Sequence, residues 1–184
     1  MSLDDDFDRL IERAAAGDSE ALGELWRQHN PHLLRYLRSL SPGGYEDLAS
    51  AVWLDVARIL PTFSGTRSGF HSLLFTIARR RHVDLIRASY RRPEVVSSHV
   101  PDWGEPAPHH DAEELDEVLR RVRTLPPDQA EAVALRVIGQ LDIDQIASLL
   151  RKSPGAVRVA LHRGLKRLGE EAALARGVGS IGGA

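Results

Sequence analysis

Basic side chains recur at helical spacing toward the C-terminal end of the chain. From Arg151 to Arg167 the sequence carries six lysines and arginines and no acidic residue. Arg158, His162 and Lys166 follow at intervals of four, with Arg163 beside them, so a helix would present them on one face. Such a face suits phosphate oxygens and guanine edges, which indicates nucleic-acid binding. A solvated basic face without a ligand is the simpler alternative.

A second basic segment lies in the first half of the chain. From Arg79 to Arg92 there are six arginines and one acid, Asp84. The stretch from Pro93 to Leu119 is the opposite, with eight acidic residues and no lysine or arginine. The net charge of -2 therefore conceals two basic segments separated by an acidic one, a distribution that is compatible with a nucleic-acid-binding protein.

Three further patterns concern enzyme or metal chemistry. They are the glycine motif Gly177–Gly182, the histidine pairs His29 with His32 and His109 with His110, and the acidic pairs Glu113-Glu114 and Asp116-Glu117. The glycine motif lacks a preceding strand and a following helix, the histidines lack the context of a known metal site, and the acids fit a solvated segment. We therefore predict no catalytic residue, metal or cofactor, and no enzymatic activity.

Composition sets the class of protein. Of 184 residues, 42% are apolar and 27% charged, which predicts a folded chain with one large or two small domains. Cysteine is absent, which excludes disulfides and thiolate metal sites. No apolar run is long enough to span a bilayer, and the N-terminus is acidic, so we expect a soluble cytoplasmic protein without membrane insertion.

Apolar residues at three-and-four spacing predict the helices of the first half. Two should lie between Phe7 and Leu40, separated at Gly17-Asp18-Ser19, and a third should run from Tyr45 to Leu60. A loop over 63–69 then leads to a fourth, with Leu85 and Ile86 among its inward residues. The proline-rich, acidic stretch that follows predicts a linker. We expect an all-α protein with domains at 1–92 and 112–170, a flexible acidic linker at 93–111 and a flexible tail at 171–184.

The second half carries a helix-turn-helix pattern. A short helix ending at Leu150 is followed by the break Arg151-Lys152-Ser153 and by a longer helix that buries Val157, Leu161, Leu165 and Leu168. Ser153 suits the N-cap and Pro154 the first turn, so the second helix should begin at a defined point and fit the major groove. Arg158 lies in its first turns and is the candidate for base contact, and Arg163 and Lys166 are candidates for phosphate contact.

Motifs over nearly the whole chain resemble the sigma-70 superfamily, and within it the small extracytoplasmic-function (ECF) group. The motifs of the second half resemble region four, the reader of the -35 promoter element; they are Leu125–Gln129, Asp144–Ala147, Ser153–Arg158 and Leu161–Gly164. By this resemblance the protein gives RNA polymerase its promoter specificity and needs no cofactor. The implied -35 DNA-binding residues are Ser153, Arg158, Val159, His162, Arg163 and Lys166.

The first half resembles region two in two places. Residues from Glu46 to Leu54 resemble the helix that docks on the clamp helices of the largest polymerase subunits, which implies docking by Asp47, Leu48, Ser50, Trp53 and Leu54. Residues from Phe63 to Arg87 resemble the segment that melts the -10 element, in which the loop from Ser64 to Ser68 would hold a flipped base. The implied contacts to this single strand are Ser64, Thr66, Arg67, Arg79, Arg80, Arg81 and Arg87.

Two statements about partners complete these expectations. Most members of the family are held inactive by an anti-sigma factor, so the resemblance implies such a partner in addition to core polymerase and double- and single-stranded promoter DNA. The alternative is a stand-alone helix-turn-helix regulator whose first half senses a signal. The basic segment at Arg79–Arg92 counts against it, because a sensor domain would not require one.

Overall fold

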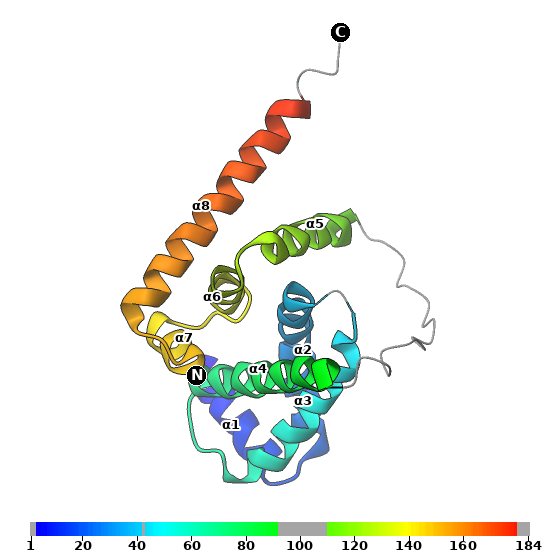
Figure 1. Ribbon diagram of the computed structural model, residues 1–184. Helices are drawn as coiled ribbons and strands as arrows, with labels where there is room; N and C mark the ends of the chain where they lie inside the picture. Colours follow the sequence, from blue (N-terminus) through cyan, green and yellow to red (C-terminus); the bar gives the residue numbers. More distant parts are fainter. Residues whose placement is uncertain (1–2, 42, 92–109, 180–184) are drawn as a thin grey trace.

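The computed structural model describes residues 3–41, 43–91 and 110–179, and every regular element in these ranges is helical. The N-terminal domain contains α1 (Leu3–Ala15), α2 (Ser19–Leu40), α3 (Tyr45–Ile59), the 3-10 turn η1 (Leu60–Thr62) and α4 (Arg67–Arg91). The second domain contains α5 (His110–Thr124), α6 (Pro127–Val137), α7 (Ile143–Leu150) and α8 (Pro154–Gly179) (Figure 1). The predicted all-helical architecture is confirmed.

The N-terminal domain begins as the sequence predicts. Gly17 has a φ of +91°, which lets the chain reverse between α1 and α2 without a Cβ clash. Asp18 then caps α2, because its carboxylate accepts hydrogen bonds from the N–H groups of Glu20 at 2.9 Å and Ala21 at 3.2 Å. Large buried side chains join the four helices into one core; they include Phe7, Leu25, Leu33, Tyr36, Phe70 and Leu74.

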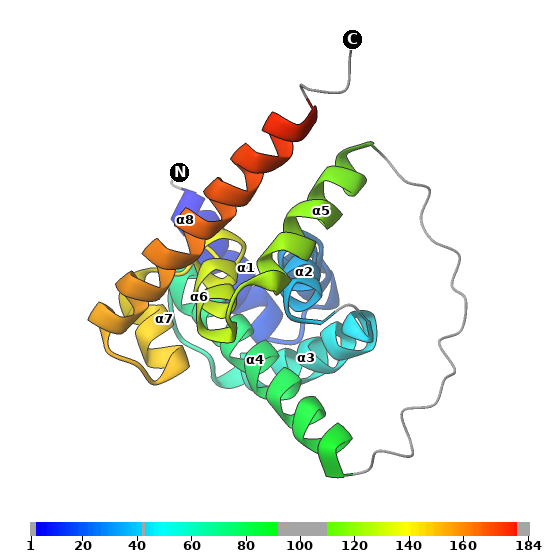
Figure 2. The same ribbon diagram turned by 45° about the horizontal axis from the view of Figure 1, so that its top comes forward.

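Helix α4 differs from the prediction at both ends. It begins at Arg67, inside the expected loop, because Thr66 caps it: the Thr66 carbonyl accepts from Phe70 N–H at 2.9 Å and its Oγ1 from Gly69 N–H at 3.3 Å. At the other end Leu85 is 48% exposed and Ile86 41% exposed, so their inward assignment is wrong. The last turns of α4 project beyond the helices on which its first half packs (Figure 2).

The second domain is built around α6, α7 and α8. Its core includes Val133, Leu135, Leu141, Ile146, Val157 and Leu161. Leu165 is 49% exposed, so its predicted burial is wrong, whereas the helix itself continues to Gly179, beyond the expected boundary at residue 170. The run that extends it begins Glu171-Ala172-Ala173-Leu174-Ala175-Arg176, all of which favour helix. Residues 92–109, with most of the predicted linker, and residues 180–184 lie outside the described residues.

The two domains pack against each other. Contacts run from α2 to both α5 and α6, and from α4 to α7 (Figures 1 and 2). Within the described ranges, no helix is long and apolar enough to cross a membrane.

Candidate nucleic-acid interface

The helix-turn-helix is held in place by local hydrogen bonds. Asp142 and Gln145 form a capping box at the start of α7: the Asp142 carboxylate accepts from Gln145 N–H at 2.8 Å, and Gln145 Oε1 accepts from Asp142 N–H at 2.9 Å. The helix ends at Arg151, which adopts a left-handed conformation with φ 54°. Ser153 Oγ then accepts a hydrogen bond from Ala156 N–H at 3.2 Å, as expected of the N-cap of α8. The direction of α8 is thus set by its first residues.

The outer face of α8 contains the predicted -35 residues. Ser153, Arg158, Val159, His162, Arg163 and Lys166 are all exposed. Val157 and Leu161 on the opposite side are buried against α6 and α7. Lys166 lies 3.8 Å from Glu170, while no ion pair joins Arg158 or Arg163 to another described residue. This face therefore presents basic groups and the apolar side chain of Val159 to solvent, as base and phosphate contact would require.

On the side of α8 away from this basic face, Gly164 lets α8 approach α6 closely. A Cβ on Gly164 would lie 2.8 Å from Val133 Cγ2 and 3.4 Å from Gln129 Cβ, both on α6. Ordinary carbon–carbon contacts are about 3.5–4.0 Å, so only glycine fits here without a shift. The turn is also tied to α6, because Lys152 forms an ion pair with Asp128.

The arginines of the first basic segment point in different directions. Successive residues on a helix are about 100° apart, so three neighbours cannot share one face. Arg80 is exposed, while Arg79 pairs with Glu131 of α6 at 2.6 Å and Arg81 donates through Nε to Asp55 of α3 at 2.7 Å. In this conformation of the chain the three arginines therefore do not form one surface, and their contact with a DNA strand stays a prediction. Arg87 is exposed and lies 3.9 Å from Asp84.

The segment before α4 presents polar groups at the surface. Ser64, Thr66 and Arg67 are exposed, as their predicted roles need. Because α4 already includes Arg67 and Ser68, only the start of the expected base-binding loop is free of helix. The Arg67 guanidinium lies 5.0 Å from the centre of the Phe7 ring, which orients it against the domain core.

The candidate docking surface on α3 is partly exposed. Asp47, Ser50 and Leu54 are exposed, Leu54 by 61%, and Leu48 is half-buried. Trp53 is only 8% exposed, and its Nε1 donates to Asn30 Oδ1 at 3.0 Å, so the indole is a core side chain and not part of the exposed surface of α3. Its place in an apolar stripe of α3 already favoured burial.

His29, one of the histidines considered as metal ligands, is a buried side chain packed against other rings of the N-terminal domain. The His29 ring lies 4.8 Å from that of His71 and 5.2 Å from that of Phe70. Burial, then the nearby His71, Arg67 and His32, lowers the pKa of His29 to about 3. Among the described residues no group of three or more histidines and carboxylates gathers as metal ligands would.

Sequence reasoning singled out Arg79 and the acidic pair Asp116-Glu117, but it did not assign either a partner in the other domain. Glu131 and Asp116 form interdomain ion pairs with Arg79 and Arg38, and Gln145 donates to Ser68. The only signal was the isolated acid Glu131 within the apolar run of α6, which points to a charged partner without naming it.

Two helical domains, one with a helix-turn-helix and an exposed basic second helix, define this chain as a helix-turn-helix protein. Residues 25–92 match the family model of Sigma-70 region 2, and residues 115–168 match that of Sigma-70, region 4. The chain belongs to the ECF sigma factors of the sigma-70 family, which direct promoter-specific transcription by RNA polymerase.

Similar proteins extend along most of the chain. The ECF RNA polymerase sigma factor ShbA of Streptomyces griseus is 35% identical over 176 residues, covering 86% of this chain and 91% of its own. The ECF RNA polymerase sigma factor SigD of Mycobacterium tuberculosis is 32% identical, covering 90% and 83%.

Two solved structures share the fold. CnrH in complex with the cytosolic domain of CnrY has a TM-score of 0.63 at 21% identity, covering 91% of this chain and 97% of that one. The sigma factor RpoE in complex with the anti-sigma factor NepR from Bartonella quintana has a TM-score of 0.59 at 21% identity, covering 80% and 95%.

Proposed function

We propose that this sigma factor reads the -35 element through α8 while its N-terminal domain docks on core polymerase and binds the melted -10 strand. The observation that carries this proposal is the exposed basic face of α8, whose position is set by the Ser153 cap and by the Gly164 contact with α6. A helix presented in this way fits the major groove, with its first turns nearest the bases.

The side chains of α8 divide into two roles. Arg158 lies one turn from the N-terminus and can reach a guanine edge with two hydrogen bonds. Val159, 49% exposed beside it, suits a thymine methyl group. Arg163 and Lys166 lie further along the helix and suit phosphate oxygens, which position the helix without reading sequence. Ser153 and His162 complete this contact surface.

The N-terminal domain contributes two surfaces. Arg80 and Arg87 are exposed on α4, and with Arg67, Ser64 and Thr66 they form the candidate surface for a single strand. A separate apolar surface, where α3 meets the end of α4, suits the polymerase clamp helices because aliphatic side chains are exposed there among charges. It includes Ile59 and Leu85, which line one hollow with Leu48; Asp47, Ser50 and Leu54 are also exposed on α3.

An anti-sigma factor is the third partner in this proposal, with the cytoplasm as the place of action. Support comes from the folds that resemble this one, since RpoE was solved in complex with the anti-sigma factor NepR. No catalytic group is assigned in this mechanism, because docking and DNA contact account for the named residues.

Run-off transcription tests the proposal. Sigma-free bacterial core polymerase is incubated with a promoter library, with and without the full chain. Protein-dependent transcripts whose templates share spaced -35 and -10 elements are expected. Absence of transcripts, with binding of the isolated protein to a palindromic site, would instead identify a stand-alone regulator.

A further inference from the structure

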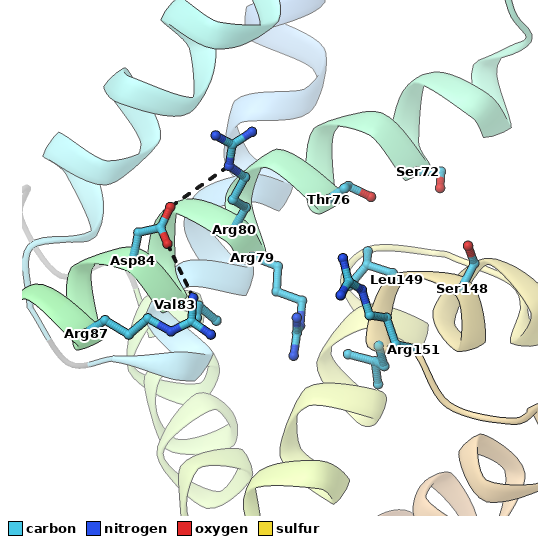
Figure 3. A pocket seen from close by; sticks show the side chains of 11 residues that line it. Ser72, Thr76, Arg79, Arg80, Val83, Asp84, Arg87, Ser148, Leu149 and Arg151 are labelled. Carbon is cyan, nitrogen blue, oxygen red and sulfur yellow. Dashed lines mark ion pairs between the residues drawn. The ribbon is translucent and has the colours of Figure 1, made fainter.

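A cavity of about 600 Å³ lies between α4 and the end of α7 (Figure 3). That volume is within the range of small-molecule sites, about 300–1,000 Å³. Two contacts join the domains near it: Arg79 of α4 pairs with Glu131 of α6 at 2.6 Å, and Gln145 of α7 donates through Nε2 to Ser68 Oγ at 2.8 Å. The cavity therefore has two defined walls, one from each domain.

Positive charge dominates the lining of this cavity. Four arginines border it; they are Arg79, Arg80, Arg87 and Arg151. Among the described residues the lining has one carboxylate, that of Asp84, which lies 4.0 Å from Arg80 and 3.9 Å from Arg87. A second carboxylate, that of Glu131, pairs with Arg79. Four arginines against two carboxylates leave an excess of two positive charges, which favours an anion with two or more negative charges.

Two of these arginines face each other across the cavity. Figure 3 shows the side chains of Arg79 and Arg151 extending from opposite walls into the space between α4 and α7, while that of Arg80 turns toward Asp84 and away from α7. Arg151 is exposed, and no ion pair joins it to another described residue. Two guanidinium groups that face each other repel, and an anion between them would turn this repulsion into two attractions.

Hydroxyl groups supply further donors beside the arginines. Ser72 and Thr76 lie at helical spacing on the face of α4 that continues to Arg79 and Arg87, and Ser148 lies on the opposite wall. The three hydroxyls form no hydrogen bond with another described residue. A hydroxyl can donate one hydrogen bond, so each is available to an anion in the cavity. The combination of arginines and hydroxyls is suited to phosphate oxygens.

Apolar side chains border the same space and limit which anion fits it. They are Val83 on α4 and Leu149 and Leu150 at the end of α7. A free phosphate ion would leave these side chains in contact with water. A nucleotide would place its phosphates on the arginines and its base on the apolar side chains, so it uses both parts of the lining.

We propose that this cavity binds a small molecule with a diphosphate group, of the nucleoside diphosphate class, through Arg79, Arg87 and Arg151. A guanidinium group can hold a phosphate with two parallel hydrogen bonds, and two linked phosphates offer oxygens to both walls. Arg87 is shared with the candidate surface for a single strand, whereas Arg151 and Ser148 have no place in that surface. This inference goes beyond the proposed promoter function and does not depend on it.

Binding of a fluorescent nucleoside diphosphate, N-methylanthraniloyl-ADP, to the full chain tests the site by fluorescence anisotropy at constant ionic strength. Arg151→Gln removes the charge of one wall and keeps a long side chain at this left-handed position. Ser148→Asp adds a carboxylate to the same wall. The matched control is Arg27→Gln, which removes the same charge from α2, where Arg27 pairs with Glu24 and does not line the cavity. Circular dichroism checks that each variant is folded.

The parent protein should bind the probe, and the variants should separate. Arg151→Gln should weaken binding about tenfold or more, the factor expected for the loss of one charge-assisted hydrogen bond. Ser148→Asp should weaken binding as well, because its carboxylate would repel the phosphates. Arg27→Gln should leave the affinity unchanged. Unlabelled ADP and inorganic pyrophosphate should displace the probe, whereas adenosine should not.

Three outcomes would overturn the proposal. Equal affinities of the parent, Arg151→Gln and Arg27→Gln for the probe would show that the cavity does not hold it. Displacement by adenosine, or failure of pyrophosphate to displace the probe, would show that the cavity does not recognise a diphosphate group. If Arg151→Gln weakened binding of the probe and of a labelled single-stranded DNA oligonucleotide by the same factor, the cavity would be a part of the DNA surface and not a separate site.

Discussion

The packing of α8 on α6 can be tested with two glycines of the same helix. In Gly164→Ala the new methyl group would lie 2.8 Å from Val133 Cγ2, about 1 Å closer than ordinary contact. Val133 is 3% exposed, so its side chain has little room to move away. Gly169 is on the same helix, and a Cβ there meets nothing within 4 Å. Gly169→Ala is therefore a matched control for the effect of alanine on the helix itself.

The two substitutions should change stability in opposite directions. Alanine favours a helix interior over glycine by about 0.8–1 kcal/mol, so Gly169→Ala should stabilise the protein by up to that amount. At Gly164 the same gain is opposed by overpacking of about 1–3 kcal/mol, which is the larger effect, so a net loss of about 1 kcal/mol is expected. Unfolding in urea, followed by far-ultraviolet circular dichroism of the full chain, measures both.

The interpretation of Gly164 has a clear counter-result. If Gly164→Ala stabilised the protein as much as Gly169→Ala, the approach of α8 to α6 would not require glycine. A shift of α8 away from α6 should also weaken binding to a -35 duplex, since the basic face moves with the helix. Gly169→Ala should leave that binding unchanged, because its position is open to solvent.

Three other predictions concern DNA reading, pH and capping. Arg158→Ala should lose about 1–3 kcal/mol of discrimination between bases at one -35 position, whereas Lys166→Ala should weaken binding to every duplex and reduce the salt slope by about one unit. Binding titrations of matched and random duplexes at several salt concentrations measure both effects. Equal losses of affinity for both duplexes in Arg158→Ala would contradict this division of roles. Burial lowers the pKa of His29 to about 3, so between about pH 6.5 and 3 the unfolded chain binds a proton at His29 that the folded chain does not, and the free energy of unfolding should decrease as the pH is lowered through this window. His29→Phe should reduce this slope by up to about 1.4 kcal/mol per pH unit, measured by urea unfolding at stepped pH. An unchanged slope would show that His29 does not contribute. Asp142→Ala removes the capping box of α7 and should lower the free energy of unfolding by about 1 kcal/mol. Asp144→Ala, in the same turn, keeps the capping box and should lower it by less. Equal losses of stability in thermal unfolding would argue against a stabilising cap at Asp142.

Much of the second domain was predictable because its signals are local. The Ser153 cap, the basic face of α8 and the break at Arg151-Lys152 depend on residues within a few positions of one another. Periodicity therefore assigned the exposed side of α8 correctly for Arg158, Arg163 and Lys166. It failed at Leu165, which has the spacing of a buried residue but is 49% exposed and lines a cavity with Val137 of α6 and Leu168.

The N-terminal domain shows where local patterns are insufficient. Trp53 was assigned to docking and lies in the core, while Leu85 and Ile86 were assigned to the core and are exposed. The docking role of Trp53 came from the family resemblance, whereas its apolar spacing favoured burial. At Leu85 and Ile86 the spacing describes one face of a helix without stating how far along it the neighbouring helices extend. The start of α4 was missed for a different reason, since Thr66 has to act as its cap before Arg67 and Ser68 can join the helix.

The sequence by itself determined that this chain is helical, that its charges are segregated, and that a capped helix presents a basic face to solvent. Those properties arise from interactions three or four residues apart, which a single stretch of sequence contains. Only the tertiary structure decided that Arg79 pairs with Glu131, that Arg81 pairs with Asp55, and that the two domains close on each other. An arginine has the same sequence signature whether it contacts solvent, a phosphate or a carboxylate, and its partner is set by which distant segment the fold places within a few ångströms of it.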